Sequence, residues 1–152
     1  CMAYAKGAVD LFPVKANPVK VKELWHYYLH IEWLRERHVY TLMRQRGAKE
    51  LWQGLYEFPL IESDKALGAD TLHQRIATLL SGMGIDIKDC VFAEPKTYQH
   101  KLTHRTINAT FLYTKLTNSI PVPSETYSPF ELSEMKKLPI SRVIDRYLSD
   151  GQ

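Results

Sequence analysis

One short segment of the chain gathers side chains that could bind an anion and recognise the polar edge of a ring. Between Tyr98 and Arg105 these are His100, Thr103 and His104. An imidazole can be neutral or cationic near neutral pH, and a hydroxyl both donates and accepts hydrogen bonds. Residues 95–118 carry four basic and no acidic side chains, whereas residues 51–94 carry three basic and seven acidic ones. Such a segment could read a damaged base and contact its phosphates, but an ordinary Thr/His-rich strand pair has the same composition.

Alternating apolar residues predict the strands that hold this segment. Residues 96–102 and 105–116 are predicted as two strands, so the segment between them lies at a loop tip. Residues 25–33 and 38–46 are predicted to form a hairpin across a polar turn, and a short strand is predicted near residues 90–93.

Two amphipathic helices complete the expected fold. The first has Asp70 as its N-cap and ends at Gly82 or Gly84, after a loop from Glu62 to Gly68. The second covers residues 140–148. Together these elements predict an α+β fold in which helices pack on a mixed β-sheet as an α/β/α sandwich.

Three other side chains could bind a metal or react, and for each a structural role is expected. His26 and His30 share the polar face of a predicted half-buried strand, where roughly 13 Å would separate their backbones, too far for one ion. We therefore expect them to be solvated histidines. Cys90 lies among apolar residues and is expected to be a small buried side chain.

Residues 51–60, Leu-Trp-Gln-Gly-Leu-Tyr-Glu-Phe-Pro-Leu, place a glycine among aromatic and leucine side chains before Pro59. By composition this is a buried strand with a bulge at Gly54. Followed by a helix, it resembles the equivalent part of a Nudix-type domain. A Nudix hydrolase binds Mg²⁺ and a pyrophosphate through several glutamates of that helix, but residues 72–84 contain no carboxylate. Metal-dependent hydrolysis is therefore not expected.

Four motifs together resemble the C-terminal domain of A/G-specific adenine DNA glycosylases, the MutY family. They are Arg44-Gln45-Arg46, residues 51–59, His100-x-Leu102-Thr103-His104 and Leu138-Pro139-Ile140. In that family this Nudix-like domain recognises 8-oxoguanine opposite the adenine that another domain excises. Its loop usually reads Phe-Ser-His, so the resemblance implies that Thr103 supplies the hydroxyl for the N7–H/O8 edge. The implied 8-oxoguanine and DNA contacts are His100, Leu102, Thr103, His104 and Arg105.

The resemblance also implies how the parent protein is organised. Cys1 matches the last of four ligands of a [4Fe–4S] cluster, so the chain is expected to be a fragment whose cofactor belongs to the parent alone. Residues 1–22 are expected to be the linker from the absent catalytic domain, with possible phosphate contacts at Lys15, Lys20 and Lys22. Residues 23–152 are expected to be the DNA-recognition domain, without glycosylase activity of its own.

The implied partners are duplex DNA containing an 8-oxoguanine·A mispair and the N-terminal catalytic domain of the same chain, in base excision repair. Two alternatives stay open: a Nudix-type hydrolase of nucleoside diphosphate derivatives, and a protein-interaction domain with an inactive Nudix fold. The length of 152 residues predicts a single domain. Two cysteines offer no disulfide framework, and the sequence has no apolar run of about 18 residues and no signal peptide. We expect a monomer in the bacterial cytoplasm, associated with the nucleoid and not with a membrane.

Overall fold

One long strand organises the protein. In the computed structural model, β1 (Lys22–Arg35) pairs along one side with β6 (Arg105–Leu116) in parallel. Its other side is shared by β4 (Leu60–Ser63) and β2 (His38–Gln45), both antiparallel to it. The structure describes residues 21–47, 53–117, 120–122, 124 and 126–150.

The remaining strands extend this sheet in both directions. Strands β3 (Tyr56–Glu57) and β7 (Ser128–Glu131) pair with β2, and β5 (Lys96–Lys101) forms the opposite edge, antiparallel to β6. The principal order is β3-β2-β1-β6-β5, in a sheet of seven strands within the described residues. The predicted mixed sheet is therefore confirmed.

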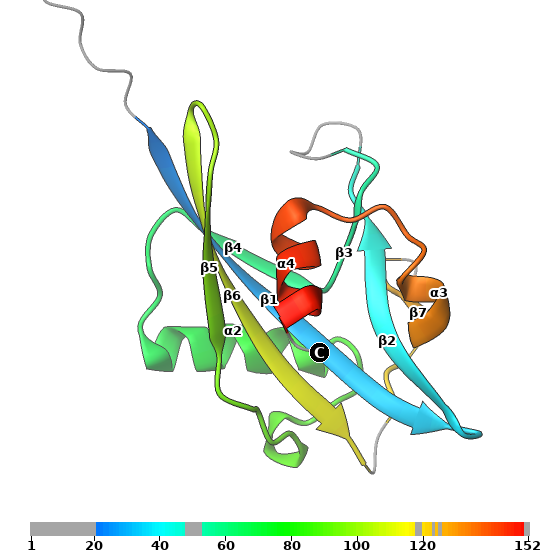
Figure 1. Cartoon of the computed structure of the whole chain (residues 1–152). Coiled ribbons are helices and arrows are strands. Elements are labelled where there is room, and N and C mark those ends of the chain that lie inside the picture. The colour runs from blue at the N-terminus through cyan, green and yellow to red at the C-terminus, as the bar shows by residue number, and fades with distance from the viewer. Residues whose placement is uncertain (1–20, 48–52, 118–119, 123, 125, 151–152) are drawn as a thin grey trace, which may run out of the picture.

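Helices cover both faces of the sheet (Figure 1). They are α2 (Ala69–Ser81), the 3₁₀ helix η1 (Ile87–Asp89), α3 (Leu132–Met135) and α4 (Arg142–Asp150). Alternate residues of β1 enter two separate cores: Leu29 packs with Leu80 of α2, and Tyr28 packs with Tyr147 of α4. The α/β/α sandwich predicted from the sequence is confirmed.

Both histidines of β1 are buried, and the prediction that they face solvent is wrong. His26 is 1% exposed and His30 is 7% exposed. That prediction assumed one solvated face of β1, but Tyr147 of α4 lies against His30, and Tyr28, Arg46 and Glu62 lie around His26. Each imidazole instead lies near a tyrosine hydroxyl, His26 at 3.2 Å from Tyr28 and His30 at 2.7 Å from Tyr147.

The start of α2 also differs from the prediction. Gly68 is the N-cap, and Asp70 lies in the first turn, where a carboxylate interacts favourably with the helix dipole. The preceding loop is shorter than predicted, because Leu60–Ser63 form β4 against β1.

Two further segments are less regular than their sequences suggest. In place of a strand over residues 90–93, Phe92 makes one bridge to Thr114, and Cys90 is half-buried after η1. Helix α4 begins two residues later than predicted, because Ile140 forms a bridge with Tyr56.

Candidate functional site

The segment between Tyr98 and Arg105, predicted to contact a base and its phosphates, includes the tip of the β5–β6 hairpin. The two strands pair as far as Lys101 and Thr106, and the Leu102 amide then donates a 2.7 Å hydrogen bond to the Arg105 carbonyl. Thr103 and His104 consequently occupy a two-residue tip, and both are exposed. Figure 1 shows this hairpin projecting away from α4, beside the start of β1.

The first residue of β1 is joined to this tip. The backbone amide of Lys22 donates a 3.1 Å hydrogen bond to the carbonyl of His104, and Lys22 lies opposite Arg105 in the parallel register. Lys22 and Arg105 are both exposed. The position at which the chain enters the domain therefore helps to fix the conformation of the hairpin tip.

The structure thus brings Lys22 together with four of the five hairpin residues implied by the resemblance, Leu102, Thr103, His104 and Arg105. Leu102 and His100 are half-buried, and His100 lies lower in β5, opposite Ile107. Lys15, Lys20 and Cys1 lie outside the described residues. The binding role of all these residues stays a prediction.

A second polar cluster lies beneath the turn at Gly54. Glu57 is 1% exposed and accepts hydrogen bonds from Arg44 at 2.7 Å and from Arg46 at 2.5 Å. Burial raises the pKa of the Glu57 carboxyl, and the two guanidinium groups counter that effect. The Arg46 amide donates to the Leu55 carbonyl, and the Gly54 amide donates to the Arg46 carbonyl. The cluster therefore supports the turn, in which Gly54 has a φ of +84°.

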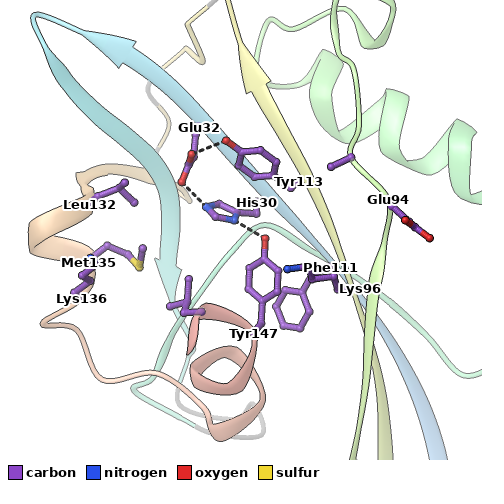
Figure 2. A pocket seen from close by; sticks show the side chains of 12 residues that line it. His30, Glu32, Glu94, Lys96, Phe111, Tyr113, Leu132, Met135, Lys136 and Tyr147 are labelled. Carbon is purple, nitrogen blue, oxygen red and sulfur yellow. Dashed lines mark hydrogen bonds and ion pairs between the residues drawn. The ribbon is translucent and has the colours of Figure 1, made fainter. Parts of the chain in front are cut away.

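A third polar group forms one wall of a cavity of about 440 Å³ between α3, α4 and the sheet (Figure 2). The hydroxyl of Tyr147 lies 2.7 Å from His30 Nδ1, and the hydroxyl of Tyr113 donates to Glu32 at 2.8 Å. His30 Nε2 and Glu32 Oε2 are 2.8 Å apart, which is ion-pair distance, although they lack the alignment of a hydrogen bond. Apolar side chains, including Phe111 and Met135, form the rest of the wall.

The electrostatics of this group favour an ionised Glu32. Burial raises the pKa of Glu32, but His30 and Tyr113 oppose it with larger combined effect, so the pKa lies below its usual value. Burial and the neighbouring Glu32 together raise the pKa of Tyr113 to about 12. Burial likewise raises the pKa of Tyr147. Both tyrosines are therefore neutral hydroxyl groups at neutral pH.

Sequence reasoning did not find this cluster. Glu32 and Tyr113 meet only because β1 and β6 run in parallel, with His30 opposite Tyr113, and Tyr147 comes from the C-terminal helix. No motif connects these positions along the chain.

Replacing Tyr147 with phenylalanine should lower the free energy of unfolding by about 1–3 kcal/mol, the usual cost of leaving a buried polar group without its partner. The ring, which stacks on Phe111 at a centroid distance of 4.1 Å, would be retained. Urea unfolding measures the change, and Ser149→Ala on the exposed side of the same helix is the control. A Tyr147→Phe variant as stable as the control would contradict a structural role for the His30 hydrogen bond.

The side chains of α2 do not fit a Mg²⁺ centre. Its one carboxylate is Asp70, in the exposed first turn, and a pyrophosphate-bound Mg²⁺ needs several oxygen ligands. Across the part of the chain that the structure describes, no group of three or more His, Cys, Asp or Glu side chains is placed to hold a metal ion. Among these same residues, no helix is long and apolar enough to cross a membrane.

The NUDIX domain family model matches residues 26–150, so the chain belongs to this family. Several solved structures share its fold. The Ap4A hydrolase of C. elegans has a TM-score of 0.60 and 14% identity, over 83% of this chain and 93% of that chain. The C-terminal domain of mouse MUTYH, solved in complex with human PCNA, has a TM-score of 0.56 and 15% identity, over 83% and 85%.

The NUDIX domain of Shewanella oneidensis NrtR, solved with ADP ribose, has a TM-score of 0.57 and 11% identity, over 86% of this chain and 89% of that chain. At these identities the likeness extends to the fold alone. A hydrolase, a MUTYH domain and a domain solved with ADP ribose all share this fold, so the fold alone does not distinguish between their functions.

Proposed function

We propose that this chain is the 8-oxoguanine-recognition domain of an adenine DNA glycosylase of the MutY family, acting on duplex DNA with an 8-oxoguanine·A mispair. The observation that carries the proposal is the two-residue tip of the β5–β6 hairpin, which exposes Thr103 and His104 beside Arg105 and Lys22. The motifs shared with that family and the similar fold of the mouse MUTYH domain support it.

The chemistry of the tip suits the difference between the damaged and the normal base. 8-Oxoguanine has an N7–H donor and an O8 acceptor where guanine has an N7 acceptor alone. The Thr103 hydroxyl accepts from N7–H, and backbone amides of the exposed tip donate to O8. His104, Arg105 and Lys22 contact the phosphates, and half-buried Leu102 makes apolar contact with the base in place of the family's phenylalanine.

In this proposal the N-glycosidic bond is hydrolysed by the catalytic domain of the parent protein, not by this chain. The residues before β1 link the two domains, since Lys22 already belongs to the sheet, and Cys1 is the last ligand of the parent's [4Fe–4S] cluster. The chain itself supplies affinity and base preference. Such a protein works at DNA in the cytoplasm of a bacterium.

A Nudix hydrolase remains the second candidate, because the Ap4A hydrolase of C. elegans has the same fold. The carboxylate-poor α2 helix argues against it. Incubating the chain with Mg²⁺ and nucleoside diphosphate derivatives such as 8-oxo-dGTP decides between the two. Hydrolysis that Mg²⁺ removal abolishes would favour the hydrolase.

Replacing Thr103 with alanine should reduce the preference for 8-oxoguanine·A over G·A duplexes by roughly 5- to 150-fold, as the loss of a base contact worth about 1–3 kcal/mol does. Folding should be unaffected, because the Thr103 side chain is exposed at the hairpin tip. Fluorescence anisotropy gives the affinity of the chain for both duplexes, and single-turnover rates give the preference of the parent enzyme.

The matched variant is His104→Ala, which should weaken binding to both duplexes alike, as the loss of a phosphate contact does. An equal loss on both duplexes for Thr103→Ala would leave Thr103 as a turn residue without a role in base reading.

A further inference from the structure

The edge strand β5 and helix α4 together carry cationic side chains on one face of the protein. Lys96 Nζ lies 6.0 Å from the centre of the Tyr147 ring, and the Arg146 guanidinium lies 5.2 Å from the centre of the Tyr98 ring. Side chains alternate along a strand, so His100 points to the same face as Lys96 and Tyr98. The basic residues of β5 and α4 therefore adjoin each other across this edge.

Arg146 is exposed, and its surroundings restrict its orientation. Its guanidinium lies over the Tyr98 ring, and burial together with the nearby Asp150 carboxylate, in the next turn of α4, raises the pKa of Tyr98. Because Arg146 is exposed, the N–H donors of its guanidinium are accessible to a ligand. A planar guanidinium binds a phosphate through two parallel hydrogen bonds, a geometry that the compact ammonium of a lysine does not offer.

The same face reaches the hairpin tip. Lys22 and Arg105 pair at the start of β1 and β6, on the α4 side by strand alternation. β5 has six residues and so spans roughly 20 Å. Since each DNA strand carries one phosphate per about 3.4 Å of helix axis, cations along this edge face several successive phosphates.

The opposite face of the sheet is less suited to a polyanion. Helices α2 and η1 lie there, within the segment of residues 51–94 that carries seven acidic and three basic side chains. Its exposed carboxylates include Asp64, Asp70, Asp86 and Asp89. On the α4 side, Asp145 and Asp150 balance Arg142 and Arg146 of the same helix, and the excess positive charge comes from Lys22, Lys96 and Arg105. A duplex that meets the hairpin tip is therefore attracted more to the α4 side than to the α2 side.

We propose that the duplex contacted by the hairpin tip continues across β5 and α4, where Arg146, oriented by Tyr98, binds a backbone phosphate and Lys96 binds a neighbouring one. This inference rests on the proposed function and adds the side of the domain on which DNA lies. Arg146 contributes affinity for any duplex, whereas Thr103 contributes preference for the damaged base.

The test measures the affinity of the chain for a short duplex at several NaCl concentrations, with and without 8-oxoguanine. Each lost phosphate contact makes the slope of log K against log[salt] shallower by about 0.9. Arg146→Ala should show this change equally for both duplexes. Arg146→Lys should retain most of the slope but bind more weakly, because the charge remains and the paired hydrogen bonds are lost.

Lys88→Ala is the matched control, since Lys88 is an exposed cation of η1 on the α2 side. It should leave affinity and slope unchanged, and thermal unfolding checks that each variant folds. An unchanged slope for Arg146→Ala, or a shallower one for Lys88→Ala, overturns the inference while Thr103→Ala still tests base reading. If the unmodified chain binds no duplex at all, the proposed function and this inference both fall.

Discussion

Replacement of Glu57 by alanine is expected to lower the free energy of unfolding by about 3–5 kcal/mol, the range found when one partner of a buried ion pair is removed. Glu57 is 1% exposed and Arg46 is 5% exposed, so water cannot replace the carboxylate. After the substitution the next carboxylate near Arg46 is Glu62, 3.8 Å away and half exposed. Urea unfolding at neutral pH measures the difference.

Two matched variants identify the cause of that loss. Glu57→Gln keeps the shape and one acceptor oxygen and should lose less stability than Glu57→Ala. Glu62→Ala removes the more distant, exposed carboxylate and should cost under about 1 kcal/mol, as surface ion pairs do. If Glu57→Ala costs no more than Glu62→Ala, the two arginines do not depend on Glu57.

The Glu57 cluster shows what a local motif predicts well. The sequence predicted a bulge at Gly54, which requires a positive φ; the φ of +84° agrees, although Gly54 lies in a turn before β3 and not within a strand. The arginines at positions 44 and 46 entered only through the family resemblance. Their common partner became visible once β2 and β3 were paired, because Arg44 lies opposite Glu57 in that register.

The hairpin that carries the proposed reading residues was predictable for a similar reason. The strands predicted at residues 96–102 and 105–116 correspond to β5 and β6, which are adjacent in sequence and joined by a short turn. Local alternation and a polar turn suffice for such an antiparallel pair. Contacts made between neighbours in sequence are the ones that a pattern can encode.

The burial of His26 and His30 was not predictable in this way. Alternation of apolar and polar residues in β1 indicated one solvent-exposed face. However, β1 is a central strand of the sheet, parallel to β6, and both of its faces are covered. The parallel partner β6 begins 70 residues after the end of β1 and is reached through α2. Its register places Tyr113 opposite His30, and nothing local to either strand encodes that contact.

The burial of His26 should make stability depend on pH in a defined window. Burial and the nearby Arg46 lower the pKa of His26 from 6.5 to about 4 in the folded protein. The unfolded chain therefore binds the proton more tightly, and stability is complete above pH 6.5 and falls as the pH drops towards 4. A shift of this size corresponds to about 3 kcal/mol. The raised pKa of Glu57 opposes this fall just above pH 4.5, its value in the unfolded chain, because the folded protein then binds the proton more tightly. The lowered pKa of Glu32 adds to the loss of stability below pH 4.5.

A comparison with His26→Gln isolates the contribution of His26, because the carboxylates titrate in both proteins. Urea unfolding at a series of pH values from 7 to 4 should show a steep fall in stability for the unmodified chain and a much flatter curve for His26→Gln. The exposed histidine of α2 provides the control, and His73→Gln should follow the unmodified chain throughout. Parallel curves for His26→Gln and the unmodified chain would show that His26 is protonated in the folded protein as readily as in the unfolded one.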